Sequence, residues 1–299
     1  MELERNSESL ENTYSQEEGL EVESEITEEL ESDQEEPCQE SQQESDYELS
    51  QAEGDVEPLR GSFRAEEELL AYSQEVSFSI YFFGEDIWYD NGESDRMPAA
   101  SVIKVYIMRY VYSLMESGEI SSDYLIGGQR AGELIRVMIQ QSDNHATNAL
   151  IDYFGMESIN QYLLEQGYRD TVLQRRMLDD EARNLGLDNY TSTRDTMEFL
   201  RRLYSNQSIF PYNEILEVML GQQFNTKIPL FLPDDATVAN KTGELDDIEN
   251  DIGIVFTEDA AFAIVVLSQG VNDTERMRRG IGLLALEALE YIRENKGED

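Results

Sequence analysis

Ser101 and Lys104 are the two residues of this chain best spaced to do chemistry together. They stand at the start of an apolar stretch, and a spacing of i and i+3 places two side chains on one face of a helix. A lysine in an apolar setting beside other cations holds its proton weakly, so it can accept one from a hydroxyl. The helix N-terminus adds N–H groups where negative charge would develop. The pair predicts a serine nucleophile activated by a lysine.

Two more short motifs follow along the chain, Ser142–Asn144 and Lys241–Gly243. The first lies in the connection between two predicted helices, where side chains can point into a cleft and a hydroxyl can relay a proton to a leaving nitrogen. The second is expected to begin a strand, whose edge can align an acyl-peptide-like substrate through main-chain hydrogen bonds. Gly243 permits close approach of the substrate, and Lys241 supplies a cation for a substrate carboxylate.

The elements that must position these motifs are helices in the middle of the chain. From Ser101 to Met115 the apolar residues cover nearly all sides of a helix, which predicts that this helix is buried. Further helices are predicted over residues 131–139, 144–154, 156–166, 195–204 and 212–221.

Strand patterns stand on both sides of this helical stretch. After a short helix over 65–70, residues 76–83 and 87–89 predict an antiparallel hairpin with one buried face. Residues 250–256 and 260–267 predict two more strands, and a last helix follows over 274–293. This order predicts an α+β fold in which an antiparallel sheet, formed by both chain ends, packs against a helical subdomain.

The acidic residues divide the chain into two parts. The first 60 residues hold 22 of the 64 acidic residues and 2 of the 22 basic ones, and their apolar residues occur singly. Such a segment cannot bury enough surface to offset the entropy of ordering the chain. We therefore predict a disordered acidic tail over 1–62 and one catalytic domain over 63–299.

Composition excludes several classes of partner and cofactor. With a formal net charge of −42, the chain would be repelled by nucleic acid and by an anionic membrane surface. No apolar run reaches the roughly 20 residues of a membrane span, and Met1–Arg5 does not begin a secretory signal. Cys38 is the single cysteine and His145 the single histidine, so no intrachain disulfide can form. We expect no metal and no cofactor.

Taken in order, the motifs S-x-x-K, S-D-N and K-T-G resemble the signature of the class A β-lactamase-like serine hydrolases, the penicillin-recognising enzymes. The resemblance extends from about residue 64 to residue 294 and implies an active site between the sheet and the helical subdomain. It implies that Ser101 forms the acyl-enzyme, that Lys104 and Ser142 transfer protons, that Asn144 contacts the substrate amide beside Thr242 and Gly243, and that the N–H groups of Ser101 and Glu244 form the oxyanion hole.

One stretch departs from the family pattern. Class A β-lactamases carry E-P-x-L-N in a loop after S-D-N, and its Glu activates the water that removes the acyl group. Residues 173–184 hold no such motif. Asp179 or Glu181 could take the role of this base, but both could instead form ion pairs with the arginines of the loop, at positions 175, 176 and 183.

Three functions therefore remain open. The first is hydrolysis of β-lactams through a seryl acyl-enzyme, and the second is a peptidase or transpeptidase reaction on peptidoglycan D-amino acid peptides. The third is a non-hydrolytic penicillin-binding or sensing module. In each, we expect a monomer with a small-molecule partner. The usual substrate of the family implies an extracellular or cell-surface location.

Overall fold

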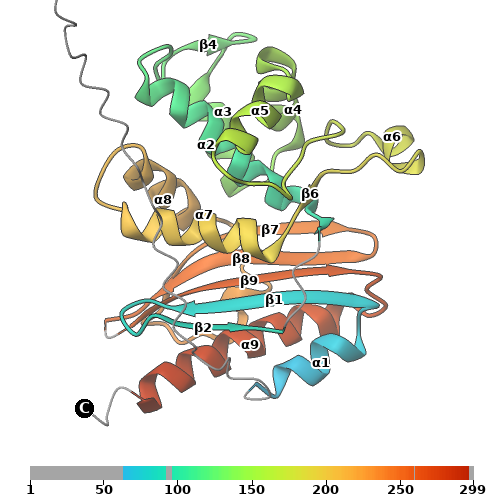
Figure 1. Ribbon diagram of the computed structural model, residues 1–299, viewed down its shortest axis with the longest axis vertical. Coiled ribbons are helices and arrows are strands. Elements are labelled where there is room, and N and C mark those ends of the chain that lie inside the picture. Colours follow the sequence, from blue (N-terminus) through green and yellow to red (C-terminus); the bar gives the residue numbers. More distant parts are fainter. Residues whose placement is uncertain (1–62, 92–95, 259, 296–299) are drawn as a thin grey trace, which may run out of the picture. The chain divides into compact units, whose positions relative to one another are not determined.

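A five-stranded antiparallel sheet organises the protein, in the strand order β2-β1-β9-β8-β7 (Figure 1). The computed structural model describes residues 63–91, 96–258 and 260–295, so the predicted tail over 1–62 lies outside the described residues. The strands are β1 (Glu75–Phe82), β2 (Ile87–Asp90), β7 (Thr237–Leu245), β8 (Ile248–Phe256) and β9 (Ala261–Gln269). Along its whole length β1 pairs with β9, which confirms that both ends of the chain share one sheet.

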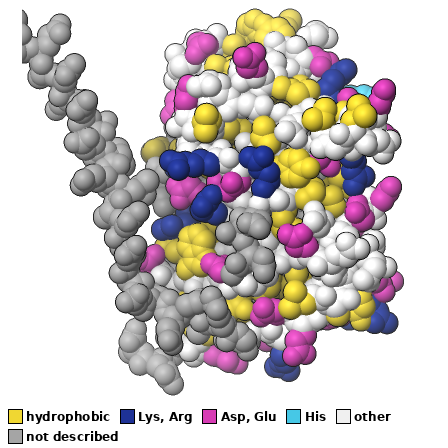
Figure 2. Space-filling model, turned by 45° about the vertical axis from the view of Figure 1, so that its right-hand side comes forward, with side chains coloured by type: hydrophobic (Ala, Val, Ile, Leu, Met, Phe, Trp, Pro, Cys, Tyr) yellow, Lys and Arg dark blue, Asp and Glu magenta, His cyan; other side chains and the backbone are white. Residues whose placement is uncertain are grey.

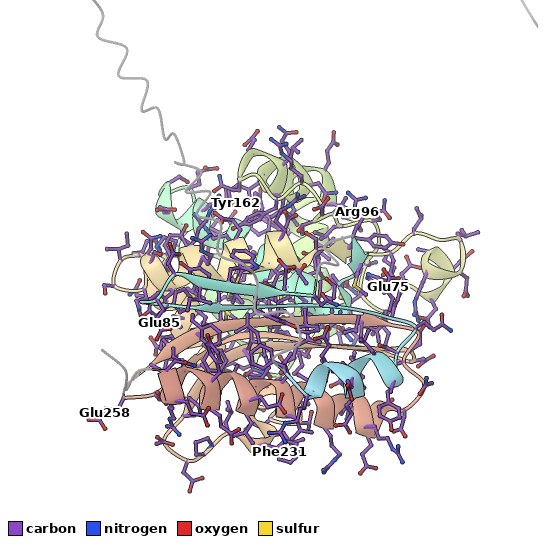
Figure 3. All side chains as sticks on the ribbon, turned by 60° about the horizontal axis from the view of Figure 1, so that its bottom comes forward. Glu75, Glu85, Arg96, Tyr162, Phe231 and Glu258 are labelled. Carbon is purple, nitrogen blue, oxygen red and sulfur yellow. The ribbon has the colours of Figure 1, made fainter. Side chains whose placement is uncertain are left out.

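Both faces of this sheet are buried. Helices α1 (Ala65–Ala71) and α9 (Thr274–Asn295) cover one face, and there Phe78 and Ile80 of β1 pack with Met277 and Ile281 of α9. Figure 3 shows the two layers, with Phe231 on the α9 side of the sheet and Tyr162 in the helical layer on the other side. The prediction of one buried face for β1 is therefore wrong, because residues of both alternating sets are covered.

The helical layer is built around α2 (Ile103–Glu116), in which every residue from Ile103 to Tyr112 is buried. This confirms the prediction of a helix that is apolar on most sides. Its neighbours are the other predicted helices, which are confirmed with small shifts at their ends: α3 (Ala131–Gln140), α4 (Asn144–Phe154), α5 (Met156–Glu165), α7 (Thr193–Ser205) and α8 (Tyr212–Leu220).

Several short elements were not predicted from sequence. They are β3 (Met97–Pro98), which pairs with β6 (Tyr190–Thr191), β4 (Leu125–Ile126), which pairs with β5 (Gln129–Arg130), helix α6 (Asp180–Asn184), and the 3-10 turns η1 (Ala100–Val102) and η2 (Ile228–Phe231). Elements of two to five residues are too short to show a hydrophobic period. The β3–β6 pair fixes the chain just before Ser101.

Candidate active site

The three sequence motifs meet at one pocket of about 240 Å³. Five of the predicted site residues line it together with two that were not predicted, Gln141 and Phe224. The complete lining is Ser101, Gln141, Ser142, Asn144, Phe224, Thr242 and Glu244. Lys104 and Lys241 lie behind this lining and are wholly buried. The structure thus brings together residues that are far apart in the sequence.

Ser101 lies in η1, directly before α2, on a segment that other strands hold in place. The Ala99 N–H donates to the Asn189 carbonyl at 2.8 Å, and Asn250 Nδ2 of β8 donates to the Pro98 carbonyl at 2.9 Å. Ala100 has a φ of 46°, a left-handed conformation that costs a non-glycine residue about 1–3 kcal/mol. The strained turn persists because these hydrogen bonds fix the chain on either side of it.

Gly243 of β7 packs directly against this turn. A Cβ atom at Gly243 would lie 2.9 Å from the Ala99 carbonyl oxygen and 3.2 Å from the backbone nitrogen of Ser101. Side-chain carbons do not approach backbone atoms so closely, so β7 and the turn at Ala100–Val102 touch here only because residue 243 has no side chain.

Gly243→Ala should therefore destabilise the protein, by about 1–3 kcal/mol in free energy of unfolding, because the turn or the strand has to move. Urea denaturation measures the change. Gly221→Ala is the matched control, since the three atoms nearest to its Cβ would all belong to the Gln140 side chain, which can move, and none to the backbone. If both variants lost the same free energy of unfolding, the close approach of β7 to the turn would not explain the effect of Gly243→Ala.

Lys104 is held by the second motif. Its Nζ donates to the Ser142 carbonyl at 2.7 Å, to Ser142 Oγ at 3.1 Å and to Asn144 Oδ1 at 2.8 Å, and among the described residues none of its hydrogen bonds goes to Ser101. Burial lowers the pKa of Lys104 to about 7, although Asp143 opposes this shift. At neutral pH a substantial fraction of the amine is therefore free of its extra proton and can act as a base.

Ser142 Oγ lies between two lysines. Besides Lys104, Lys241 donates to this hydroxyl, with its Nζ at 3.0 Å, and it also donates to the Thr242 carbonyl at 2.7 Å. Burial and the neighbouring charge of Lys104 lower the pKa of Lys241 well below its usual range. A hydroxyl that accepts from two amines keeps its own proton available to donate, so Ser142 is arranged as a proton relay. Its φ of 54° is a second strained position of the pocket.

The third motif lies inside a strand, so the prediction that it begins one is wrong. β7 starts at Thr237, four residues before Lys241, because residues 237–240 already pair with β8. β7 is the last strand of the sheet, and its outer edge has no partner strand among the described residues. An edge strand offers free main-chain groups to an extended ligand.

The structure does not bring Asp179 and Glu181 into the pocket lining. Asp179 caps helix α6, where its Oδ1 accepts the Ala182 N–H at 3.0 Å, and Glu181 lies exposed on the first turn of that helix. The predicted ion pairs with the loop arginines are also wrong. These arginines pair with other acids: Arg175 with Asp188 at 2.7 Å, Arg176 with Asp152 at 2.6 Å, and Arg183 with Asp247 at 2.9 Å.

Lys227 is a buried charge beside the site that sequence reasoning missed. Its Nζ donates to the carbonyls of Gly243 and Asn250, at 3.2 and 2.9 Å, and so ties η2 to both β7 and β8. It also pairs with Glu249 at 2.7 Å and with Glu244 at 3.2 Å. Nothing in the sequence around a lone lysine in an irregular stretch indicates that the lysine is buried. Asn250 and Asp251 could have indicated a buried partner, because they are polar residues within an apolar strand and buried polar groups need partners.

Other kinds of site find little support in the described residues. Nowhere in 63–91, 96–258 and 260–295 do three or more His, Cys, Asp or Glu side chains gather in a way that could hold a metal ion. The same ranges contain no helix of the length and apolarity that a membrane crossing requires. On the face shown in Figure 2, Lys and Arg side chains are interspersed with Asp and Glu instead of forming a continuous basic surface.

Comparison with known proteins gives a consistent result. The model of the beta-lactamase enzyme family matches residues 64–292. Among solved structures, a beta-lactamase from Sphaerobacter thermophilus is similar with a TM-score of 0.68 at 22% identity, over 77% of this chain and 97% of that one. PBP-A is similar with a TM-score of 0.66 at 23% identity, over 78% and 97% of the two chains. No curated protein matches the sequence.

Proposed function

Because the chain belongs to the beta-lactamase enzyme family, we propose that it is a serine hydrolase in which Ser101 forms a covalent acyl-enzyme with β-lactams. The observation that carries the proposal is the pair of buried lysines that both donate to Ser142 Oγ, beside a pocket that Ser101 and Ser142 line. Two amines with lowered pKa and a relay hydroxyl can move protons at neutral pH without a histidine.

Each step of acylation has a residue of this chain to perform it. Neutral Lys104 takes the proton of Ser101 as its Oγ attacks the acyl carbon. The N–H groups of Ser101 and Glu244 stabilise the negative oxygen that results. Ser142 then donates its proton to the departing nitrogen and regains one from Lys104, while Lys241 holds the hydroxyl in place. Asn144, Thr242 and the unpaired edge of β7 orient the substrate.

Hydrolysis of the acyl-enzyme has less support. Glu244 is the one carboxylate among the residues that line the pocket, and Lys227 and Arg278 both bind it. The two residues that the sequence suggested as water-activating bases, Asp179 and Glu181, do not line it. We therefore propose that acylation is fast relative to deacylation. A second candidate function follows, a D-amino acid peptidase or penicillin-binding sensor whose acyl-enzyme lasts long.

A time course with a fluorescent penicillin tests the proposal. Intact mass should show one adduct per chain, peptide mapping should place it on Ser101, and a chromogenic cephalosporin should turn over slowly. Rapid turnover with only transient adducts would show that deacylation is competent and would refute that part of the proposal. Absence of any adduct would refute acylation itself.

A further inference from the structure

Phe224 alone is apolar among the described residues that line the pocket. The other lining residues are all polar or charged: Ser101, Gln141, Ser142, Asn144, Thr242 and Glu244. Phe224 is 42% exposed, so a large part of its surface is in contact with water. An apolar group of a ligand placed against the Phe224 ring would remove apolar surface of both from water, which is favourable.

The backbone around Phe224 is fixed to the end of α3. Gln222 is buried, its Nε2 donates to the Ile139 carbonyl at 3.1 Å, and its Oε1 accepts the Phe224 N–H at 3.2 Å. The Gln223 N–H also donates to the Gln140 carbonyl at 3.0 Å. Phe224 is therefore held in place although its segment is neither helix nor strand. A backbone that is already ordered loses little entropy when a ligand binds.

The segment of Phe224 joins two walls of the pocket. The end of α3, to which the segment is bonded, leads directly into Gln141 and Ser142. Three residues after Phe224, Lys227 donates to the Gly243 carbonyl of β7 at 3.2 Å. In the acylation proposed above, Ser142 protonates the departing nitrogen. A group attached to that nitrogen is therefore the part of the substrate that we expect beside the Phe224 ring.

We propose that Phe224 is a specificity-determining residue that binds an apolar or aromatic group on the leaving-group side of the substrate. The inference rests on the proposed acylation of Ser101 and names the substrate class: β-lactams and related amides whose departing nitrogen carries an apolar substituent. An aromatic substituent adds the attraction between two rings to the burial of apolar surface. The polar groups of the substrate, a carboxylate included, remain for the polar lining residues to bind.

Two cephalosporins that share one acyl side chain and one carboxylate test the inference. One carries a methyl group at C3 and the other a styryl group, and C3 belongs to the ring that contains the departing nitrogen. In Phe224→Ala the ratio of the acylation rate constants, styryl over methyl, should fall about five- to tenfold, the order expected for one lost ring contact. The sites left free for a fluorescent penicillin after timed incubation give both rate constants.

Phe210→Ala is the matched control. It makes the same substitution at a residue that is 47% exposed and lies outside the pocket lining, so it should leave the ratio unchanged. Phe224→Trp keeps an aromatic surface at the pocket and should preserve a ratio above that of Phe224→Ala. The intrinsic reactivity of each cephalosporin is the same for every variant, so a change in the ratio reports the contact with residue 224.

The outcomes separate the inference from the function on which it rests. If Ser101 is acylated but the ratio is the same in Phe224→Ala and in Phe210→Ala, the inference fails and the proposed function stands. A ratio as low in Phe224→Trp as in Phe224→Ala would also overturn the inference, because the aromatic surface would then have no effect. If no β-lactam labels the unaltered protein, both the inference and the proposed function fail.

Discussion

Ser101→Ala should abolish the covalent penicillin adduct altogether, since no other hydroxyl of the pocket lies at the start of α2 in front of Lys104. The substitution removes one oxygen from a partly exposed side chain that makes no hydrogen bond within the described residues. We therefore expect the free energy of unfolding to change by less than about 0.5 kcal/mol. Intact mass after prolonged incubation with a fluorescent penicillin measures the loss.

The control for this experiment is Ser158→Ala, an exposed serine on α5 outside the pocket lining. The Ser158→Ala protein should be labelled by the fluorescent penicillin as fast as the unaltered protein. An adduct that persists in Ser101→Ala, at the same stoichiometry, would exclude every mechanism that passes through this serine. It would leave the three motifs without a catalytic role.

Lys104→Met should slow acylation of Ser101 by about 10²–10⁴-fold, the range that a positioned general base contributes. Methionine has nearly the same length and keeps the buried volume, but it cannot accept a proton. Stopped-flow measurement of adduct formation gives the rate. Circular dichroism should show the fold unchanged, because the loss of the hydrogen bonds that the amine donates to Ser142 and Asn144 is offset in part by the removal of a buried amine whose desolvation opposes folding.

The same residue predicts a pH dependence. Acylation requires the neutral amine, and burial brings the pKa of Lys104 to about 7. The rate should therefore rise with pH with its midpoint near 7, level off at higher pH, and fall as acid protonates the amine. In Lys104→Met this rise should disappear. If the acylation rate of Lys104→Met still rose with a midpoint near pH 7, the general base would be a group other than Lys104.

The sequence predicts most of the fold and the centre of the site. Long helices and strands are predictable because their apolar residues repeat over many positions, as in α2, where ten consecutive residues are buried. The order of the three motifs predicts a shared pocket, and the matching family model confirms the resemblance that they suggested. In α2 and in the three motifs, the local sequence pattern therefore agrees with the tertiary structure.

The remaining features depend on contacts that no local pattern records. Lys227, Asn189 and Asn250 act on the nucleophile turn or the pocket edge from distant segments of the chain. The partners of the loop arginines were also mispredicted, because Asp152 and Asp247 reach them from elsewhere in the fold. A prediction from sequence pairs an arginine with acidic residues close to it in the chain, whereas in the folded protein its partner is the carboxylate that lies close in space.

The pairing of β1 with β9 has a consequence for the order of assembly. Val76 pairs with Ser268 and Phe82 with Phe262, so the sheet cannot close until the chain has been synthesised past residue 269. A nascent chain carries β1 for most of its synthesis with one edge unpaired, and such edges recruit strands from other molecules. β7 joins β1 only through β8 and β9. We therefore expect the pocket beside β7 to form only after β9, and a polypeptide released shortly before residue 269 to be prone to aggregate.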